Sequence, residues 1–388
     1  MANVYGNGGT TASVDTAGYG TTRGNTVVHF YDRTGVKAAN RVNLYGQFAD
    51  RKSMPKKMGK TFKISKYLHM YDRALNDAEF SEKGFLSARS VEDVNTSLTT
   101  ASLAEGAGAV NQRSLQKITM ETSLARYGEM IDYTDEVELF SEDSMQVRYR
   151  EELGELANSR MEDLIQLDML ATPTVMYAGS STSLVTIDED STVSYDLIRK
   201  AVRKLVRNRA KKNTSLVVGD VKIDTRTIDK AYYAIIGAQV KGDLELLTRG
   251  TVANNGMTEF VYIPSHKYAS AGTLAEGEVG AMHEVRFIES EAAVVYAGAG
   301  ADATSHTGTL SVTSGAFDVF PILFPTQNCF ATVGLKGQGK IKFNSKSPEV
   351  VENANPYGTN GFFSYNFFYA GIILEEEKLL KVLVAASA

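Results

Sequence analysis

The sequence predicts an α+β fold in which strands dominate and the few helices are segregated from them. One long segment, residues 141–172, carries apolar residues at steps of three and four, as an amphipathic helix does. Most other ordered-looking segments are short apolar or alternating runs separated by polar turns, which is typical of strands. By contrast, residues 1–26 hold six glycines and six threonines among polar residues. Such a segment cannot bury enough apolar surface to order itself, so we expect neighbouring chains to hold it.

The composition excludes several classes of protein. A chain of 388 residues with 43% apolar and 22% charged residues has ample core for two or three domains. Its net charge of −5 argues against a protein whose main task is to wrap nucleic acid. The single cysteine, Cys329, excludes an internal disulfide and a cysteine zinc cluster, and the five histidines have no short ligand spacing. We expect no signal peptide, no membrane span and no cofactor, in a protein made in a reducing cytoplasm.

The front of the chain predicts one helix and a pair of strands. Val36–Phe48 has the pattern of a short amphipathic helix. Lys60–Tyr71 alternates as a strand whose buried face holds Phe62, Ile64, Leu68 and Met70. A second alternating run, Leu115–Leu124, is expected to pair with it antiparallel. The forty mostly polar residues between the two runs indicate a projecting arm.

Residues 141–172 are the long helix. Its apolar stripe comprises Leu153, Leu156, Ala157, Met161, Leu164, Ile165 and Leu167. Asp143 and Gln146 fit a capping box at the start, and Thr172–Pro173 ends the helix because a residue before proline avoids helical geometry. About thirty residues at about 1.5 Å each span about 45 Å, so the helix is a strut.

The second predicted helix, Ser194–Lys212, has one apolar face and one strongly basic face. The apolar face comprises Leu197, Ile198, Ala201, Val202, Leu205 and Val206. Eight lysines or arginines occupy the rest of the segment, with Tyr195 as the only aromatic residue nearby. In an acidic chain this pattern favours a solvated or subunit-facing surface over a nucleic-acid patch.

Short runs fill the remainder of the chain. Leu184–Asp190 is a short strand or turn, Ala299–Gly315 is a hairpin excursion, and Glu375–Lys378 interrupts the final strand region. The predicted strands are Leu216–Val221, Tyr232–Ile236, Phe260–Ile263, Val285–Ile288, Ala292–Ala297, Leu310–Val312, Phe317–Phe324, Gly334–Phe343 and Phe362–Val384.

No motif supports an enzyme. Gly334–Lys340 has the spacing of a phosphate-binding loop, but strand-like Ile341–Phe343 follows where that loop needs Ser or Thr and a helix. Tyr296–Ala303 imitates a dinucleotide fingerprint, but Thr304–Gly308 cannot start the required helix. The carboxylates have no histidine at a spacing that defines a site, and Cys329 fits a small buried hydrophobe. Catalytic, cofactor and metal sites are therefore not expected.

Five short pieces, in order, resemble the major capsid proteins of N-four-like podoviruses, which are schitovirus-type tailed phages. They are Met54–Thr61, Leu103–Gly106, Tyr127–Asp135, Gly277–Gly280 and Val285–Ser290. The resemblance covers nearly the whole chain and implies the Hong Kong 97 type capsid fold. It implies an N-terminal arm at 1–50, an extended β-hairpin loop with flanking strands at 51–126 and a peripheral domain at 127–186 with the spine helix. An axial domain at 187–332 and C-terminal strands at 333–388 complete it.

The resemblance also implies a function and partners. The chain would self-assemble through hexamers and pentamers into an icosahedral head that encloses double-stranded DNA without sequence-specific binding, with no membrane. A cementing protein, a portal and a separate scaffold are implied partners, and the cross-linking residues of this fold cannot be mapped. Residues expected at inter-subunit contacts are Tyr5, Tyr19, Tyr31, Phe62, Ile64, Leu68, Met70 and Glu105. For each of these tyrosines and strand residues, packing within its own subunit is the alternative.

Two other functions remain open on the sequence. An encapsulin-like compartment shell would use the same fold without DNA. A cytosolic enzyme would bind a nucleotide at Gly334–Lys340.

Overall fold

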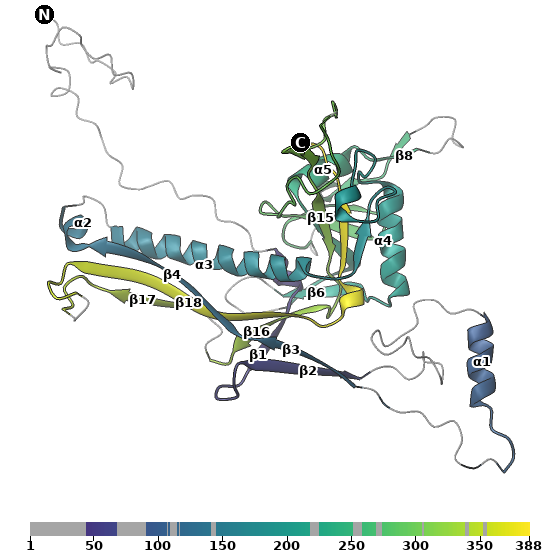
Figure 1. Ribbon diagram of the computed structural model, residues 1–388, viewed down its shortest axis with the longest axis horizontal. Coiled ribbons are helices and arrows are strands. Elements are labelled where there is room, and N and C mark those ends of the chain that lie inside the picture. Colours follow the sequence, from purple (N-terminus) through teal and green to yellow (C-terminus); the bar gives the residue numbers. More distant parts are fainter. Residues whose placement is uncertain are drawn as a thin grey trace, which may run out of the picture.

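The computed structural model describes residues 44–67, 91–106, 108, 115, 117–140, 145–217, 225–250, 258–268, 274–304, 306–337, 341–351 and 355–388. They form an elongated unit, in which a long helix lies along a sheet, and a more compact unit at one end of it (Figure 1). The mixture of helices and strands matches the predicted class.

The elongated unit is organised around one long strand. Strand β18 (Asn360–Ile373) pairs antiparallel with β4 (Ala125–Thr134), β17 (Lys342–Lys346) and β16 (Phe330–Leu335). The edge strand β1 (Asp50–Met54) pairs parallel with β16. Helix α3 (Met145–Leu170) lies along β18, and the short helix α2 (Asp135–Phe140) follows β4 at the far end (Figure 1).

Helix α3 and β18 bury matching faces. Alternate β18 residues, among them Phe363, Tyr365 and Phe367, are buried because a strand turns every second side chain to one face. The helix stripe meets them as predicted, with Leu153, Ala157 and Ile165 buried and Leu156, Met161 and Leu164 half-buried. Leu167 is 55% exposed, so its prediction as a buried member is wrong. The helix ends two residues before Thr172 as expected, whereas Asp143 lies outside the described residues.

The compact unit is built on an eight-stranded sheet with the order β10-β11-β12-β7-β15-β19-β5, with β6 paired to β7. The strand bounds are β5 Val175–Tyr177, β6 Asn213–Val217, β7 Thr225–Ile236, β10 Ile263–Pro264, β11 Glu278–Met282, β12 Val285–Glu289, β15 Phe320–Phe324 and β19 Leu380–Val384. Helices α4 (Tyr195–Arg207) and α5 (Ala238–Glu245) share a core with one face of this sheet. Ser194 caps α4 by accepting a hydrogen bond from the Leu197 backbone N–H. Val206 is 55% exposed, so its predicted place on the apolar face is wrong.

Smaller elements complete the chain. Three two-stranded ribbons pair β2 (Thr61–Tyr67) with β3 (Lys117–Ser123), β8 (Thr248–Gly250) with β9 (Thr258–Phe260), and β13 (Val312–Thr313) with β14 (Ala316–Phe317). Helix α1 spans Val91–Ala101. Short 3-10 turns occur at Tyr45–Phe48, Leu184–Thr186, Ser265–Lys267 and Glu376–Lys378.

Several local predictions meet a definite outcome. The antiparallel pairing of the two alternating front strands is confirmed, as is the break at Glu375–Lys378 between β18 and β19. Of the helix predicted at Val36–Phe48, only the 3-10 turn from Tyr45 is described; residues 36–43 lie outside the described part. Ala292–Ala297 is not a strand, because only Tyr296 forms a single bridge, to Val319. The prediction of one strand at Gly334–Phe343 is wrong: β16 ends at Leu335, a turn follows at Lys336 and Gly337, and β17 begins at Lys342. Gly339 and Lys340 lie outside the described residues.

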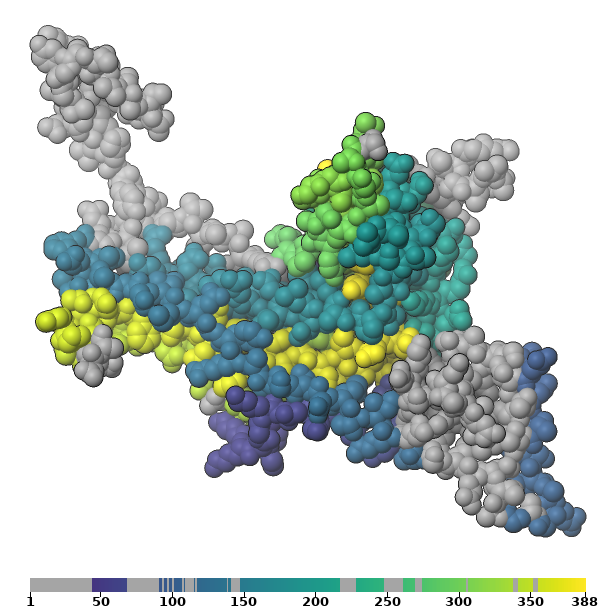
Figure 2. Space-filling view, viewed as in Figure 1, coloured from purple at the N-terminus to yellow at the C-terminus, as the bar shows by residue number. Residues whose placement is uncertain are grey.

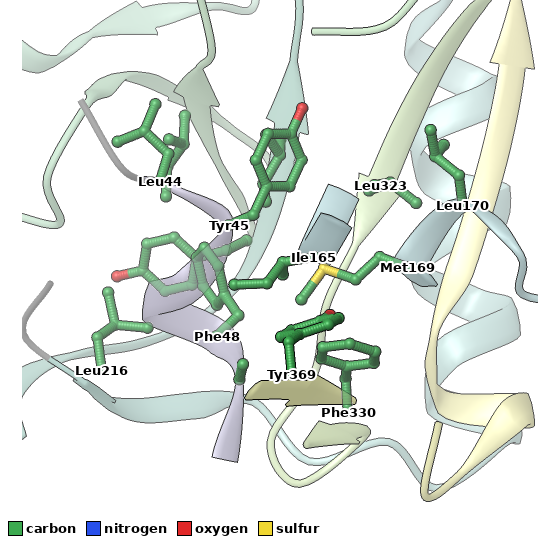
Figure 3. Close-up of a cluster of buried hydrophobic side chains, with 14 of the residues drawn as sticks. Leu44, Tyr45, Phe48, Ile165, Met169, Leu170, Leu216, Leu323, Phe330 and Tyr369 are labelled. Carbon is green, nitrogen blue, oxygen red and sulfur yellow. The ribbon is translucent and has the colours of Figure 1, made fainter. Parts of the chain in front are cut away.

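One core joins the two units. Apolar residues from the 3-10 turn, α3, β6, β15, β16 and β18 converge there (Figure 3). Its members include Leu44, Tyr45, Phe48, Ile165, Met169, Leu216, Leu323, Phe330 and Tyr369. Because the cluster draws on both sheets, the two units are fixed to each other through packed side chains.

Candidate assembly surfaces

The root of the N-terminal segment is fixed to α3 by two buried polar side chains. Glu162 and Gln166 are 3% and 1% exposed and lie one helical turn apart. The Tyr45 backbone N–H donates to the Glu162 carboxylate, and Gln166 Nε2 donates to the Tyr45 hydroxyl at 2.8 Å. These bonds fix the first described residues of the chain to α3. Tyr5, Tyr19 and Tyr31 lie outside the described residues, so their contacts stay predictions.

The root of the β2–β3 ribbon packs on its own subunit. Phe62 is half-buried and, with Met120, Leu124 and Leu374, covers a small core of Met54, Ala331, Val333, Ala370 and Ile372. This is the alternative that the sequence left open for Phe62. Ile64 is also half-buried, while Leu68 and Met70 lie outside the described residues. Inter-subunit contacts at all four residues stay predictions.

Polar bonds hold the ribbon root on the sheet and leave its other face open. Thr122 Oγ1 donates to the Gly371 carbonyl at 3.0 Å, and Lys66 pairs with Glu375. On the outer face, Lys63 and Glu121 face each other across the ribbon at 2.8 Å, with both side chains about three-fifths exposed. Tyr67 is 59% exposed. Alternate side chains on this exposed face of the ribbon are therefore available for contact with another surface.

Helix α1 presents apolar residues to solvent. Val91, Val94 and Leu98 recur at steps of three and four and are 78%, 36% and 65% exposed. An isolated helix of eleven residues is marginal in water, so a packing partner is needed to hold it. Glu105, in the turn that follows, is exposed, and its predicted contact is untested.

The far end of the elongated unit exposes large apolar side chains that the sequence analysis did not single out. Leu139 and Phe140 of α2 are 74% and 82% exposed, and Val351 and Tyr357 are 65% and 88% exposed. The Asp135 N–H donates to the Thr359 carbonyl at 2.9 Å, which brings the two segments to the same end. Figure 2 shows α2 and the start of β18 together there. Exposed apolar groups in this number indicate an interaction site.

A shallow groove lies between α3 and β4. Its volume is about 290 Å³, and its lining includes Tyr127, Leu164, Leu167 and Tyr365. Gly128 is needed beside it, because a Cβ there would lie 3.2 Å from Asn366 Cβ and collide with the Tyr365 carbonyl. The exposed Leu167 that breaks the predicted stripe therefore belongs to a second open surface.

Cys329 is a buried free thiol. Burial raises the pKa of the Cys329 thiol to about 12, which removes the thiolate needed for nucleophilic attack. No group of three or more His, Cys, Asp or Glu residues in the described ranges is arranged to hold a metal ion. Within the same ranges, no helix is both long and apolar enough to cross a membrane.

Comparisons with known proteins complete these observations. No family model matches the chain. The major capsid protein of Pseudomonas phage KPP21 is 29% identical over 362 residues, which is 90% of each chain. The capsid of Ralstonia phage GP4 superposes with a TM-score of 0.56 at 12% identity, covering 94% of this chain and 98% of that one. The cyanophage Pam1 capsid gives the same TM-score and coverage at 9% identity, and the capsid of cyanophage P-SCSP1u gives 0.52 at 10% identity, covering 94% of each chain. The chain therefore has the fold of these phage capsid proteins.

Proposed function

We propose that this chain is the major capsid subunit of a tailed double-stranded DNA phage and self-assembles into an icosahedral head. The observation that carries the proposal is the relative of the same length, a major capsid protein aligned along 90% of both chains. The shared fold of the phage capsids supports it, because those neighbours also span almost the whole chain.

Within this proposal the parts take the roles of the Hong Kong 97 type fold, and the closer kinship is with N-four-like phages. The N-terminal arm covers 1–50, the extended loop 51–126, the peripheral domain 127–186, the axial domain 187–332 and the returning strands 333–388. Helix α3 is the spine helix. Support comes from helix α1, which lies away from the body (Figure 1), from the ribbon β2–β3, whose root packs on the sheet, and from the hairpin β13–β14 in the compact unit.

The energetic logic is that of many modest contacts. The ribbon face, α1, the α3–β4 groove and the apolar far end are separate exposed surfaces on one subunit. A subunit that engages several neighbours at once gains avidity, so no single contact has to be strong. The proposed partners are copies of the chain in hexamers and pentamers, a portal, a separate scaffold and a cementing protein. The shell assembles in the host cytoplasm and is part of the mature virion.

Electron microscopy of particles tests the proposal. The full chain, co-expressed with the scaffold of its own phage, is expected to give closed shells, and a chain lacking residues 1–26 is expected not to. Phe140→Ser at the far end is expected to reduce shell yield at least tenfold, whereas Leu246→Ser, a control at a 75% exposed residue beyond α5, leaves it unchanged. Small soluble species from the full chain under all conditions would refute the capsid role.

A further inference from the structure

A basic surface on the compact unit has no role in the contacts described above. Between residues 199 and 212 the chain has eight cationic side chains and no acidic one, although its net charge is −5. Helix α4 carries the first five of them and stands at the outer side of the compact unit (Figure 1). Such a concentration makes a local positive potential that the overall charge hides.

The structure separates the cations that are neutralised from those that are free. Lys212 pairs with Glu284 at 2.7 Å and lies over the Tyr232 ring, and Arg199 lies 3.4 Å from Asp196. Lys204 Nζ donates to the Val175 carbonyl at 3.0 Å. Four exposed side chains have no hydrogen-bond or ion-pair partner anywhere in the described ranges: Lys200, Arg203, Lys211 and Lys230.

Two of the four free cations line a groove. It lies just beyond the C-terminal end of α4, has a volume of about 440 Å³ and includes Lys211, Lys230, Thr214 and Gln327 in its lining. Lys230 comes from β7, so the fold adds a cation that the basic sequence run does not contain. On α4, Lys200 and Arg203 are three residues apart and therefore lie on one face. Free cations from two separate segments, Lys211 and Lys230, thus line one groove.

We propose that this basic surface, defined by Lys200, Arg203, Lys211 and Lys230, binds the phosphate backbone of duplex DNA. The inference rests on the proposed function, because packaged DNA is the polyanion that such a shell encloses. Lysine, arginine, threonine and glutamine are side chains that contact phosphates, and they supply no base recognition here. Protein interfaces, by contrast, are depleted in lysine at their centres, and Val206 is the only large apolar side chain exposed on α4. The surface therefore turns toward the DNA in the assembled head.

Salt-dependent DNA binding tests the proposal. The full chain is titrated with a labelled duplex of about 30 base pairs, and the anisotropy is followed at several salt concentrations. Replacing all four cations by glutamine is expected to lower the slope of log affinity against log salt by about 3.6, at about 0.9 for each lost phosphate contact. Between about 50 and about 200 mM salt, the wild-type affinity then falls about a hundredfold more than that of the variant.

A matched control removes the same charge elsewhere. Lys56, Lys117, Lys267 and Lys342 are exposed, and their fourfold replacement by glutamine changes the net charge equally. The wild-type slope is expected to persist in this control. Equal losses in both variants, or no DNA binding by the wild type, would overturn the proposal. Tighter binding to polyglutamate than to DNA at the same salt would assign the surface to an acidic protein and overturn it as well.

Particle formation keeps the two proposals apart. The inference is supported if the glutamine variant still forms shells while its subunits lose the salt-dependent binding to DNA. A wild type that never forms shells counts against the capsid role, whereas the binding titration still decides whether the four cations hold DNA.

Discussion

Replacing Gly371 by alanine should destabilise the subunit at the junction of α3, β18 and the ribbon. A Cβ at Gly371 would lie 2.8 Å from Asp168 Cγ and 2.9 Å from the Tyr369 hydroxyl, and it would collide with the Asp168 carboxylate. The Tyr369 hydroxyl now donates to Asp168 Oδ2 at 2.7 Å. Overpacking costs about 1–3 kcal/mol, and loss of the buried tyrosine's hydrogen bond costs about 1–3 kcal/mol. The expected loss in the free energy of unfolding is the sum of the two, about 2–6 kcal/mol.

Urea unfolding of unassembled subunits, at one fixed protein concentration, measures this loss. The double variant Gly371→Ala with Asp168→Ala closes a thermodynamic cycle, since the smaller residue removes the collision. The double variant should lose less stability than the sum of the losses of the two single variants, by about 1–3 kcal/mol. Two results would refute the reasoning: a loss below about 0.5 kcal/mol for Gly371→Ala alone, or additive costs in the cycle.

Three further predictions use other buried groups. Because burial raises the pKa of the Cys329 thiol to about 12 and leaves it 0% exposed, thiol reagents at pH 8 should label the chain only in denaturant; rapid labelling of the folded chain would contradict this. Burial alone would raise the pKa of Asp318, but hydrogen bonds from Ser311, Gly298 and Thr313 outweigh it, and the net pKa is lowered. Its contribution to stability is therefore present above the unfolded pKa of about 3.9 and is lost as pH falls through the folded value, so Asp318→Asn should lower the melting temperature at pH 7 but progressively less below about pH 4. Tyr45→Phe, which removes the acceptor of the Gln166 bond, should cost about 1 kcal/mol in urea unfolding, and an unchanged midpoint would contradict the anchoring role of that bond.

The sequence predicted those elements whose signal is local. The charged Glu375–Lys378 breaks an apolar run, and the structure turns there between β18 and β19. The alternation in the two front runs is complete within each strand, so their pairing followed, with Phe62 opposite Thr122. Helix α3 likewise followed from its own periodicity. In each case the residues that carry the pattern also form the element.

Features that depend on distant segments were missed or misjudged. Glu162 is a carboxylate on a helix, and nothing near it in sequence shows that the Tyr45 backbone, 117 residues away, will bury it. Leu167 and Val206 lie close in sequence to the buried Ile165 and Leu205, yet both side chains are 55% exposed. The exposure of the apolar residues of α2 and the position of Lys230 in the groove beyond α4 depend on how the fold places separate segments. The periodicity of one segment carries no information on that placement.

The same short stretch of α3 and β18 holds both the turn at Tyr45 and the root of the β2–β3 ribbon. Glu162 and Gln166 hold the 3-10 turn that begins at Tyr45. One to two helical turns further, Asp168 binds Tyr369, and the next-but-one residue of β18, Gly371, accepts the bond from Thr122 of the ribbon. Packed cores transmit displacement because they contain few voids. Under the proposed capsid role, a force that a neighbouring subunit applies to the ribbon would act on the same segment of α3 that holds the turn at Tyr45, and weakening either anchor should displace both.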